Sequence, residues 1–203
     1  MNRREAERYE ESKRFAGEAA VVMTSEICTA MGYNFSRAAV AAVVSGASIQ
    51  MSDTSRAYIH GLYSSCALSI YLMRDKVNLS SIFEVGSEML KWVGGDAKAL
   101  STSEWSEIER QLEKLEEVPD RHLRALVAFT YIVGCGLFGD FNTDVSLIIA
   151  NTMLYHTVRK CLGIAGCNNI AELKYAVNVY LETDKPAAIF EVLYKNIRDW
   201  PTA

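Results

Sequence analysis

Apolar residues recur three and four positions apart through most of this 203-residue chain. That spacing predicts amphipathic helices, whereas strands would show sustained alternation and hairpin dipeptides, neither of which is found. The pattern therefore predicts an all-α fold: a single-domain bundle of about nine helices that takes in residues 1–203. The expected helices cover about 3–31, 36–45, 55–74, 80–93, 101–118, 121–138, 144–160, 168–184 and 185–200.

Charge is strongly depleted in the third quarter of the chain. From Leu123 to Val158 only Arg124, Asp140 and Asp144 are charged. A helix that is apolar almost all round is buried on most of its sides, and two such helices joined by a short connection form an antiparallel hairpin. Residues of about 121–160 are thus predicted to form a buried core hairpin. The charged helix of about 3–31 is expected to lie outside it.

The connection within this hairpin contains a spacing that resembles a calcium loop. Asp140, Asn142 and Asp144 alternate as the first three ligands of such a loop do. However, the position that must turn sharply is Val145 rather than glycine, and the position of the bidentate carboxylate is Asn151. The motif is therefore incomplete at both places where calcium binding depends on it, and the sequence predicts no metal site.

The same connection is explained by helix capping. Gly139 is predicted to end the first helix, and Asn142 or Thr143 to cap the second. Asp144 then lies in the first turn, where a negative charge is stabilised by the helix dipole by roughly 0.3–1 kcal/mol.

The helix of about 101–118 has a narrow apolar seam. Ser101 and Glu104 have the spacing of a capping box. A seam with acidic residues around it either covers the protein's own core or packs against another subunit. Because exposed tryptophans often mark interfaces, the interface candidates are the seam residues and one further tryptophan: Trp105, Ile108, Leu112, Leu115 and Trp92.

Residues of about 26–44 have the layout of a helix-turn-helix, with Gly32 at the turn. In that arrangement Asn34, Ser36 and Arg37 would be presented to base edges. Arg37 is the only basic residue of the segment, and the chain carries a net charge of −4. Both facts argue against nucleic acid as the partner, because phosphate contacts need several basic residues.

Cysteine usage and the leading residues indicate an intracellular, cytoplasmic protein. The five cysteines are odd in number and form no C-x-x-C pair, which is typical of reduced, packed thiols. The charged start contains no short apolar segment of a secretory signal. The longest uncharged stretch, Ala125 to Gly139, is shorter than the about 20 residues that span a bilayer.

No phosphate-binding loop, nucleophile elbow or metal-ligand spacing of histidines is found. The sequence therefore predicts no cofactor and favours a non-enzymatic protein–protein interaction or assembly protein, regulatory or structural, that forms homo-oligomers through helical faces. Two alternatives stay open. One is a helix-turn-helix DNA-binding regulator, and the other is a helical enzyme or small-ligand binder with a pocket beside the buried hairpin.

Overall fold

The computed structural model describes residues 3–74 and 76–201, with side chains from residue 16 onward. This part of the chain forms nine α-helices and two short strands, so the all-α, single-domain prediction is confirmed. The helices are α1 (Arg3–Ala30), α2 (Arg37–Val44), α3 (Asp53–Leu72), α4 (Leu79–Val93), α5 (Thr102–Glu113), α6 (Arg121–Cys135), α7 (Asn142–Val158), α8 (Cys167–Thr183) and α9 (Ala187–Lys195).

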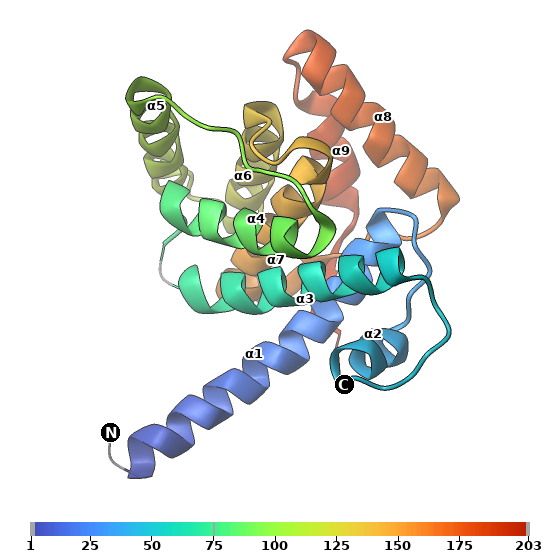
Figure 1. Cartoon of the computed structure of the whole chain (residues 1–203). Coiled ribbons are helices and arrows are strands. Elements are labelled where there is room, and N and C mark those ends of the chain that lie inside the picture. Colours follow the sequence, from blue (N-terminus) through green and yellow to red (C-terminus); the bar gives the residue numbers. More distant parts are fainter. Residues whose placement is uncertain (1–2, 75, 202–203) are drawn as a thin grey trace.

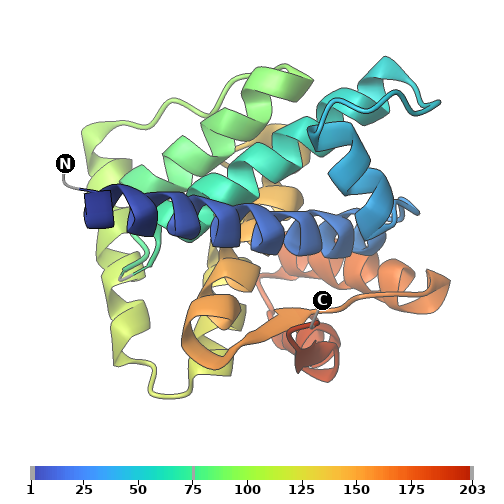
Figure 2. The ribbon, with the colours of Figure 1, turned by 90° about the horizontal axis from the view of Figure 1, so that it is seen from below.

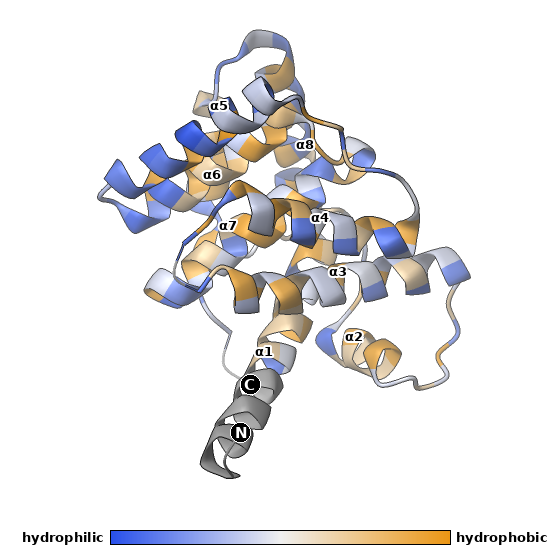
Figure 3. Ribbon diagram, turned by 60° about the vertical axis from the view of Figure 1, so that its left-hand side comes forward, coloured by the Kyte–Doolittle hydropathy of each residue, from blue (hydrophilic) through white to orange (hydrophobic). Residues whose placement is uncertain are grey.

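Helices α6 and α7 form the buried hairpin at the centre of the fold. Every residue from Asp144 to Leu154 is buried. Figure 3 shows apolar residues along both helices, interrupted by polar positions. The predicted core hairpin is confirmed. Helix α6 ends three residues earlier than expected, and α7 begins and ends two residues earlier.

The remaining helices surround this hairpin. Helices α3 and α4 pack on each other and cover α7 on one side, and α1 packs across α3 (Figure 1). Helix α8 packs on α9, and both contact α6 on the other side of the hairpin. Seen from below, α1 runs across the whole face of the molecule (Figure 2). No helix in the described segments combines the length and apolarity needed to cross a bilayer.

Several predicted helix ends are confirmed by their caps. Ser36 accepts a hydrogen bond from the Ala39 amide, and Ser101 and Glu104 form the complete capping box. Two helices begin earlier than expected, because α3 is capped by Ser52 and α4 by Asn78. In each case several Ser, Thr, Asp or Asn residues stand close together, so composition alone does not select the capping residue.

The end of the chain is the main error in the predicted fold. A helix was expected up to Trp200, but α9 ends at Lys195, and strand β2 (Ile197–Asp199) follows. Strand β2 pairs antiparallel with β1 (Lys160–Leu162). The second core helix had been predicted to continue to Lys160, but α7 ends at Val158 and β1 follows it. Strands of three residues are too short to show alternation. Arg159 adopts a left-handed backbone with φ 53°, which ends α7 just before β1.

An ion-pair network joins this small sheet to the first helix. Glu26 of α1 is 7% exposed. Its carboxylate accepts hydrogen bonds from Arg198 of β2 and from Arg37 at the start of α2, the latter at 3.5 Å. Because a buried carboxylate is costly without charged partners, these two arginines fix the end of the chain and α2 against α1.

All five cysteines are free thiols. Cys28, Cys66 and Cys161 are buried, while Cys167 is exposed at the start of α8. Burial is the main reason that the pKa of the Cys28 thiol is raised to about 12, so this group stays protonated.

Candidate functional site: an aromatic pocket at the start of helix α3

One wall of the site is built by the turn that follows α1. Gly32 adopts a φ of 93°, which reverses the chain and lets the Tyr33 amide donate to the Cys28 carbonyl at 2.8 Å. The hydroxyl of Ser25 donates to the Phe35 carbonyl at 2.9 Å and fixes the returning segment. The rings of Tyr33 and Phe35 are thereby stacked on each other, and Tyr33 contacts Tyr58 of α3.

The floor of the site is the first two turns of α3. Ser52 caps this helix by accepting from the Ser55 amide, and Asp53 is exposed in the first turn. Tyr58 lies on the inner side of the helix and is 7% exposed. The start of α3 therefore contributes a carboxylate, hydroxyl groups and a buried ring to the same place.

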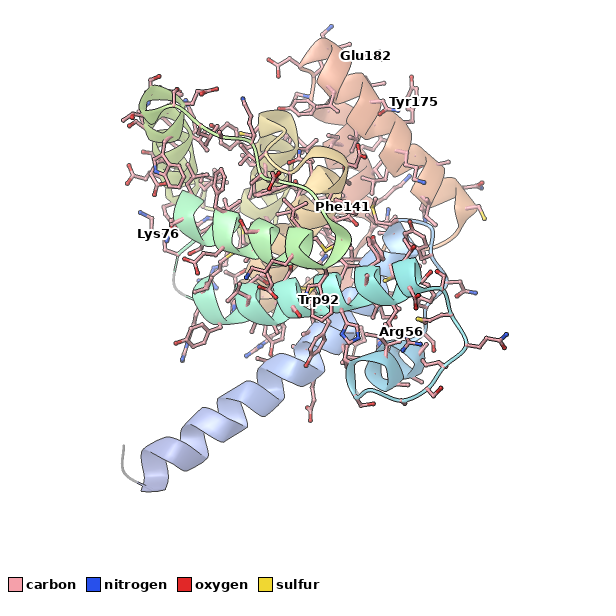
Figure 4. All side chains as sticks on the ribbon, in the orientation of Figure 1. Arg56, Lys76, Trp92, Phe141, Tyr175 and Glu182 are labelled. Atoms are coloured by element: carbon pink, nitrogen blue, oxygen red, sulfur yellow. The ribbon has the colours of Figure 1, made fainter. Side chains whose placement is uncertain are left out.

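The remaining wall comes from two distant segments. Trp92 is near the end of α4, which stops at Gly94, and Phe141 is in the connection between α6 and α7. Figure 4 labels both side chains among the helices α3 and α4. The hollow is open to solvent on one side. Its volume is about 460 Å³, within the range of small-molecule sites, and its lining is Tyr33, Phe35, Asp53, Thr54, Ser55, Ala57, Tyr58, Trp92, Val93 and Phe141.

Four of the rings form a continuous row. Phe35 stacks on Tyr33 with centroids 5.9 Å apart and planes at 11°. Tyr33 meets Tyr58 at 4.9 Å and 52°, and Tyr58 meets Phe141 at 6.5 Å and 38°. The fifth ring, Trp92, stacks on His60 at 4.8 Å. Burial and the nearby Arg56 lower the pKa of His60, which favours its neutral form.

Behind the row lies a buried polar pair. The Tyr58 hydroxyl donates a hydrogen bond to the carboxylate of Asp144, in the first turn of α7. Burial raises the pKa of Asp144 from its ordinary value of 3.8 to about 6, although the hydrogen bond from Tyr58 opposes the shift. The pKa of the Tyr58 hydroxyl is raised by burial and by this carboxylate, so Tyr58 remains a donor at neutral pH.

The raised pKa of Asp144 predicts a specific pH dependence of stability. Between about pH 4 and pH 6 the folded protein binds more protons than the unfolded chain, so this carboxyl group lowers the free energy of unfolding as pH rises. From pH 4.5 to pH 7 the loss should be about 2 kcal/mol. Urea denaturation at both pH values measures it, and Asp144→Asn should remove it.

Asp140→Asn is the matched control, because Asp140 is exposed in the same connection. Other carboxylates, such as Glu104, have lowered pKa values and change stability in the opposite direction, so the informative quantity is the difference between variants. An Asp144→Asn protein with the same pH dependence as the Asp140→Asn protein would contradict the prediction.

The structure gives separate roles to the three residues with calcium-loop spacing. Asn142 does not cap α7, and neither does Thr143: α7 has no side-chain cap. Instead the Asn142 amide donates to the Ile132 and Val133 carbonyls at 3.1 and 2.7 Å, and its oxygen accepts from the Leu137 amide at 3.0 Å. Asn142 therefore provides hydrogen-bond partners for the backbone groups at the end of α6, a role for which the sequence offers no distinct signal.

The predicted stop of α6 is also displaced. Gly136 ends this helix in a left-handed conformation with φ 60°, and Gly139 lies in a short 3-10 turn. Asp144 is in the first turn of α7 as expected, but its carboxylate is buried against Tyr58, and Asp140 is exposed. Over residues 3–74 and 76–201, no three His, Cys, Asp or Glu side chains gather as a possible metal site.

The interface candidates lie at the surface of α4 and α5 and in the core beneath them. Leu112 and Leu115 are buried, and Ile108 packs partly buried against the core. Trp105 is 38% exposed and stacks on Phe83 of α4 at 5.2 Å, while Trp92 belongs to the pocket. An interface between subunits at these positions stays a prediction.

The nucleic-acid candidates lie on the loop before α2 and at its start. Asn34 is exposed, Ser36 is the cap of α2, and Arg37 is paired with Glu26. Helix α2 has 8 residues and follows a turn at Gly32, and DNA binding by this segment stays a prediction.

Among the pocket residues, only Trp92 was predicted to have a functional role, as an interface candidate. The rings of Tyr33, Phe35, Tyr58 and Phe141 come from three further segments, and nothing in the spacing of those segments links them. The available signal was that Tyr33 directly follows Gly32 and that Phe141 lies between Asp140 and Asn142, both outside the predicted helices.

No family model matches the sequence, and no curated protein matches it significantly. Its fold, in contrast, is similar to solved structures. One is Fic-1 from C. elegans, with a TM-score of 0.67 and 14% sequence identity. The match covers 91% of this chain and 62% of that chain, so this chain spans less than two thirds of the neighbour's length. At this identity the likeness establishes the fold.

This similarity corrects the main functional prediction. A non-enzymatic interaction or assembly protein was expected because catalytic motifs are missing from the sequence. That reading is wrong, because the neighbouring structure has a helical enzyme fold. The alternative prediction of a helical enzyme or small-ligand binder, with a pocket beside the buried hairpin, fits the fold better.

Proposed function

We propose that the protein is a helical enzyme or binding protein for a small organic molecule, which binds in the aromatic pocket at the start of α3. The observation that carries this proposal is the convergence of five aromatic rings on one space of about 460 Å³. Small-molecule sites are typically concave and mainly apolar, with a few polar groups that orient the ligand. Asp53, Thr54 and Ser55 supply such groups here.

The buried pair behind the pocket supports the same proposal. Asp144 has a raised pKa and accepts a hydrogen bond from Tyr58, which lines the pocket. Carboxyl groups with shifted pKa values beside a pocket are common in functional sites. Near neutral pH, Asp144 can gain or lose a proton, and Tyr58 presents its ring to the pocket.

Saturation-transfer NMR with a set of neutral aromatic probes, indole and phenol among them, tests the proposal. We expect transfer to at least one probe, with loss of binding of about tenfold in Trp92→Ala, because the ring contributes part of the apolar wall. Trp105→Ala is the matched control: Trp105 is 38% exposed against 44% for Trp92, and it lies outside the pocket. Equal effects of the two substitutions would count against the site.

A further inference from the structure

The charge of the pocket distinguishes between classes of ligand. Among the ten lining residues, Asp53 is the only one with a charged side chain. The other polar groups of the lining residues are the hydroxyls of Tyr33, Thr54 and Ser55 and the indole N–H of Trp92, while the Tyr58 hydroxyl donates to Asp144 behind the row. An anionic ligand would thus meet a carboxylate and no arginine or lysine in the lining, and the electrostatic energy would oppose its binding.

Arg56, the basic residue of α3 nearest to the pocket, does not line it, although it lies close enough to His60 to lower the pKa of that residue. Arg56 donates to the Ile49 carbonyl at 3.0 Å, in the loop between α2 and α3. Figure 4 shows Arg56 beside α2. The start of α3 has a partial charge of about +0.5 from the helix dipole, and the full negative charge of Asp53 in the first turn exceeds it.

The rings themselves favour a positive ligand. Ring faces are electron-rich and attract an ammonium group within about 6 Å of the centroid. The hydrogen bond from the Tyr58 hydroxyl to the Asp144 carboxylate polarises Tyr58 and adds to the negative character of its ring. The planes of Tyr33 and Phe141 are tilted from that of Tyr58 by 52° and 38°. Tilted rings form a concave corner, which suits a compact cationic group.

We propose that the pocket binds a small organic cation, a quaternary ammonium or a protonated amine. Its cationic group contacts the rings of Tyr33, Tyr58 and Phe141, and the carboxylate of Asp53 lies at the rim. This inference rests on the proposed function and adds the chemical class of the ligand. The recognition is that of an aromatic cage, in which the charge of the ligand, rather than its apolar area alone, determines the affinity.

Two probes of nearly equal shape test the contribution of charge. Choline carries a trimethylammonium group, and 3,3-dimethylbutan-1-ol has a neutral tert-butyl group in its place. We expect choline to bind at least about tenfold more tightly in calorimetric titrations of the full chain. Asp53→Asn should weaken choline binding by about tenfold and leave the neutral probe unchanged.

Glu107→Gln is the control for Asp53→Asn, since it removes an exposed carboxylate of α5 outside the pocket. Phe141→Leu provides a second variant that keeps the apolar volume and removes a ring. Equal binding of the two probes would overturn the cationic ligand class. So would binding of indole or phenol in the absence of choline binding, although the pocket would then remain a ligand site. If no probe of either kind binds, the proposed function fails as well.

Discussion

Asn142→Asp is expected to destabilise the protein by about 4 kcal/mol at neutral pH, the largest effect we predict. The two side chains have the same shape, but the new carboxylate would be buried without a cation. It would face the Ile132 and Val133 carbonyls, which now accept hydrogen bonds from the Asn142 amide. Two donor–acceptor contacts would become repulsive contacts between oxygens. Urea denaturation followed by far-UV circular dichroism measures the change.

Asn168→Asp is the matched control for this substitution. Asn168 is exposed in the first turn of α8, where a negative charge is favoured by the helix dipole. Its stability should change by less than about 0.5 kcal/mol. The loss in Asn142→Asp should shrink at about pH 4, because the protonated carboxyl group can donate one hydrogen bond. Similar losses in both variants, independent of pH, would mean that Asn142 does not hold the end of α6.

Gly86→Ala should destabilise the protein by about 2 kcal/mol. A Cβ atom at Gly86 would lie 2.1 Å from Cε1 of Phe138, which is only 1% exposed and packs edge-on against Phe83. Overpacking of a rigid core costs up to about 3 kcal/mol and occasionally more. The better helix propensity of alanine offsets about 1 kcal/mol of that cost. The free energy of unfolding in urea is again the quantity to measure.

The reason for this effect can be tested by a double-mutant cycle. Phe138→Leu removes the ring atoms nearest to Gly86, so Gly86→Ala should cost at least about 1 kcal/mol less in that background. Gly17→Ala is the control glycine within a helix: its Cβ would meet only the Tyr63 hydroxyl, at 3.3 Å. We expect Gly17→Ala to be neutral or slightly stabilising. An additive cycle would show that the Gly86–Phe138 contact is not the cause.

The core of the fold could be predicted because its signal is local. The low charge from Leu123 to Val158 requires burial on most sides, and burial of α6 and α7 follows directly from it. The capping box of Ser101 and Glu104 lies within four residues and needs no tertiary contact. By contrast, β1 and β2 are stabilised by pairing between residues far apart in the chain, which a pattern along the sequence does not show.

The pocket could not be predicted for a related reason. Asp144 and Tyr58 are 86 residues apart, and only the packing of α3 on α7 brings them together. The dipole of α7 explains the position of Asp144 in the first turn but does not indicate that its carboxylate is buried. Missing motifs are no evidence against catalysis here, because a site assembled from several helices has no motif along the chain.

The pairing of Glu26 with Arg198, across 172 positions, has a consequence for synthesis on the ribosome. While the chain is being translated from its amino end, the first helix can pack on α3 long before β2 exists. During that interval only Arg37, and not Arg198, is present to pair with Glu26. A nascent chain that closed its core early would therefore bury the Glu26 carboxylate with one arginine instead of two, and the second cationic partner is added only after β2 has emerged.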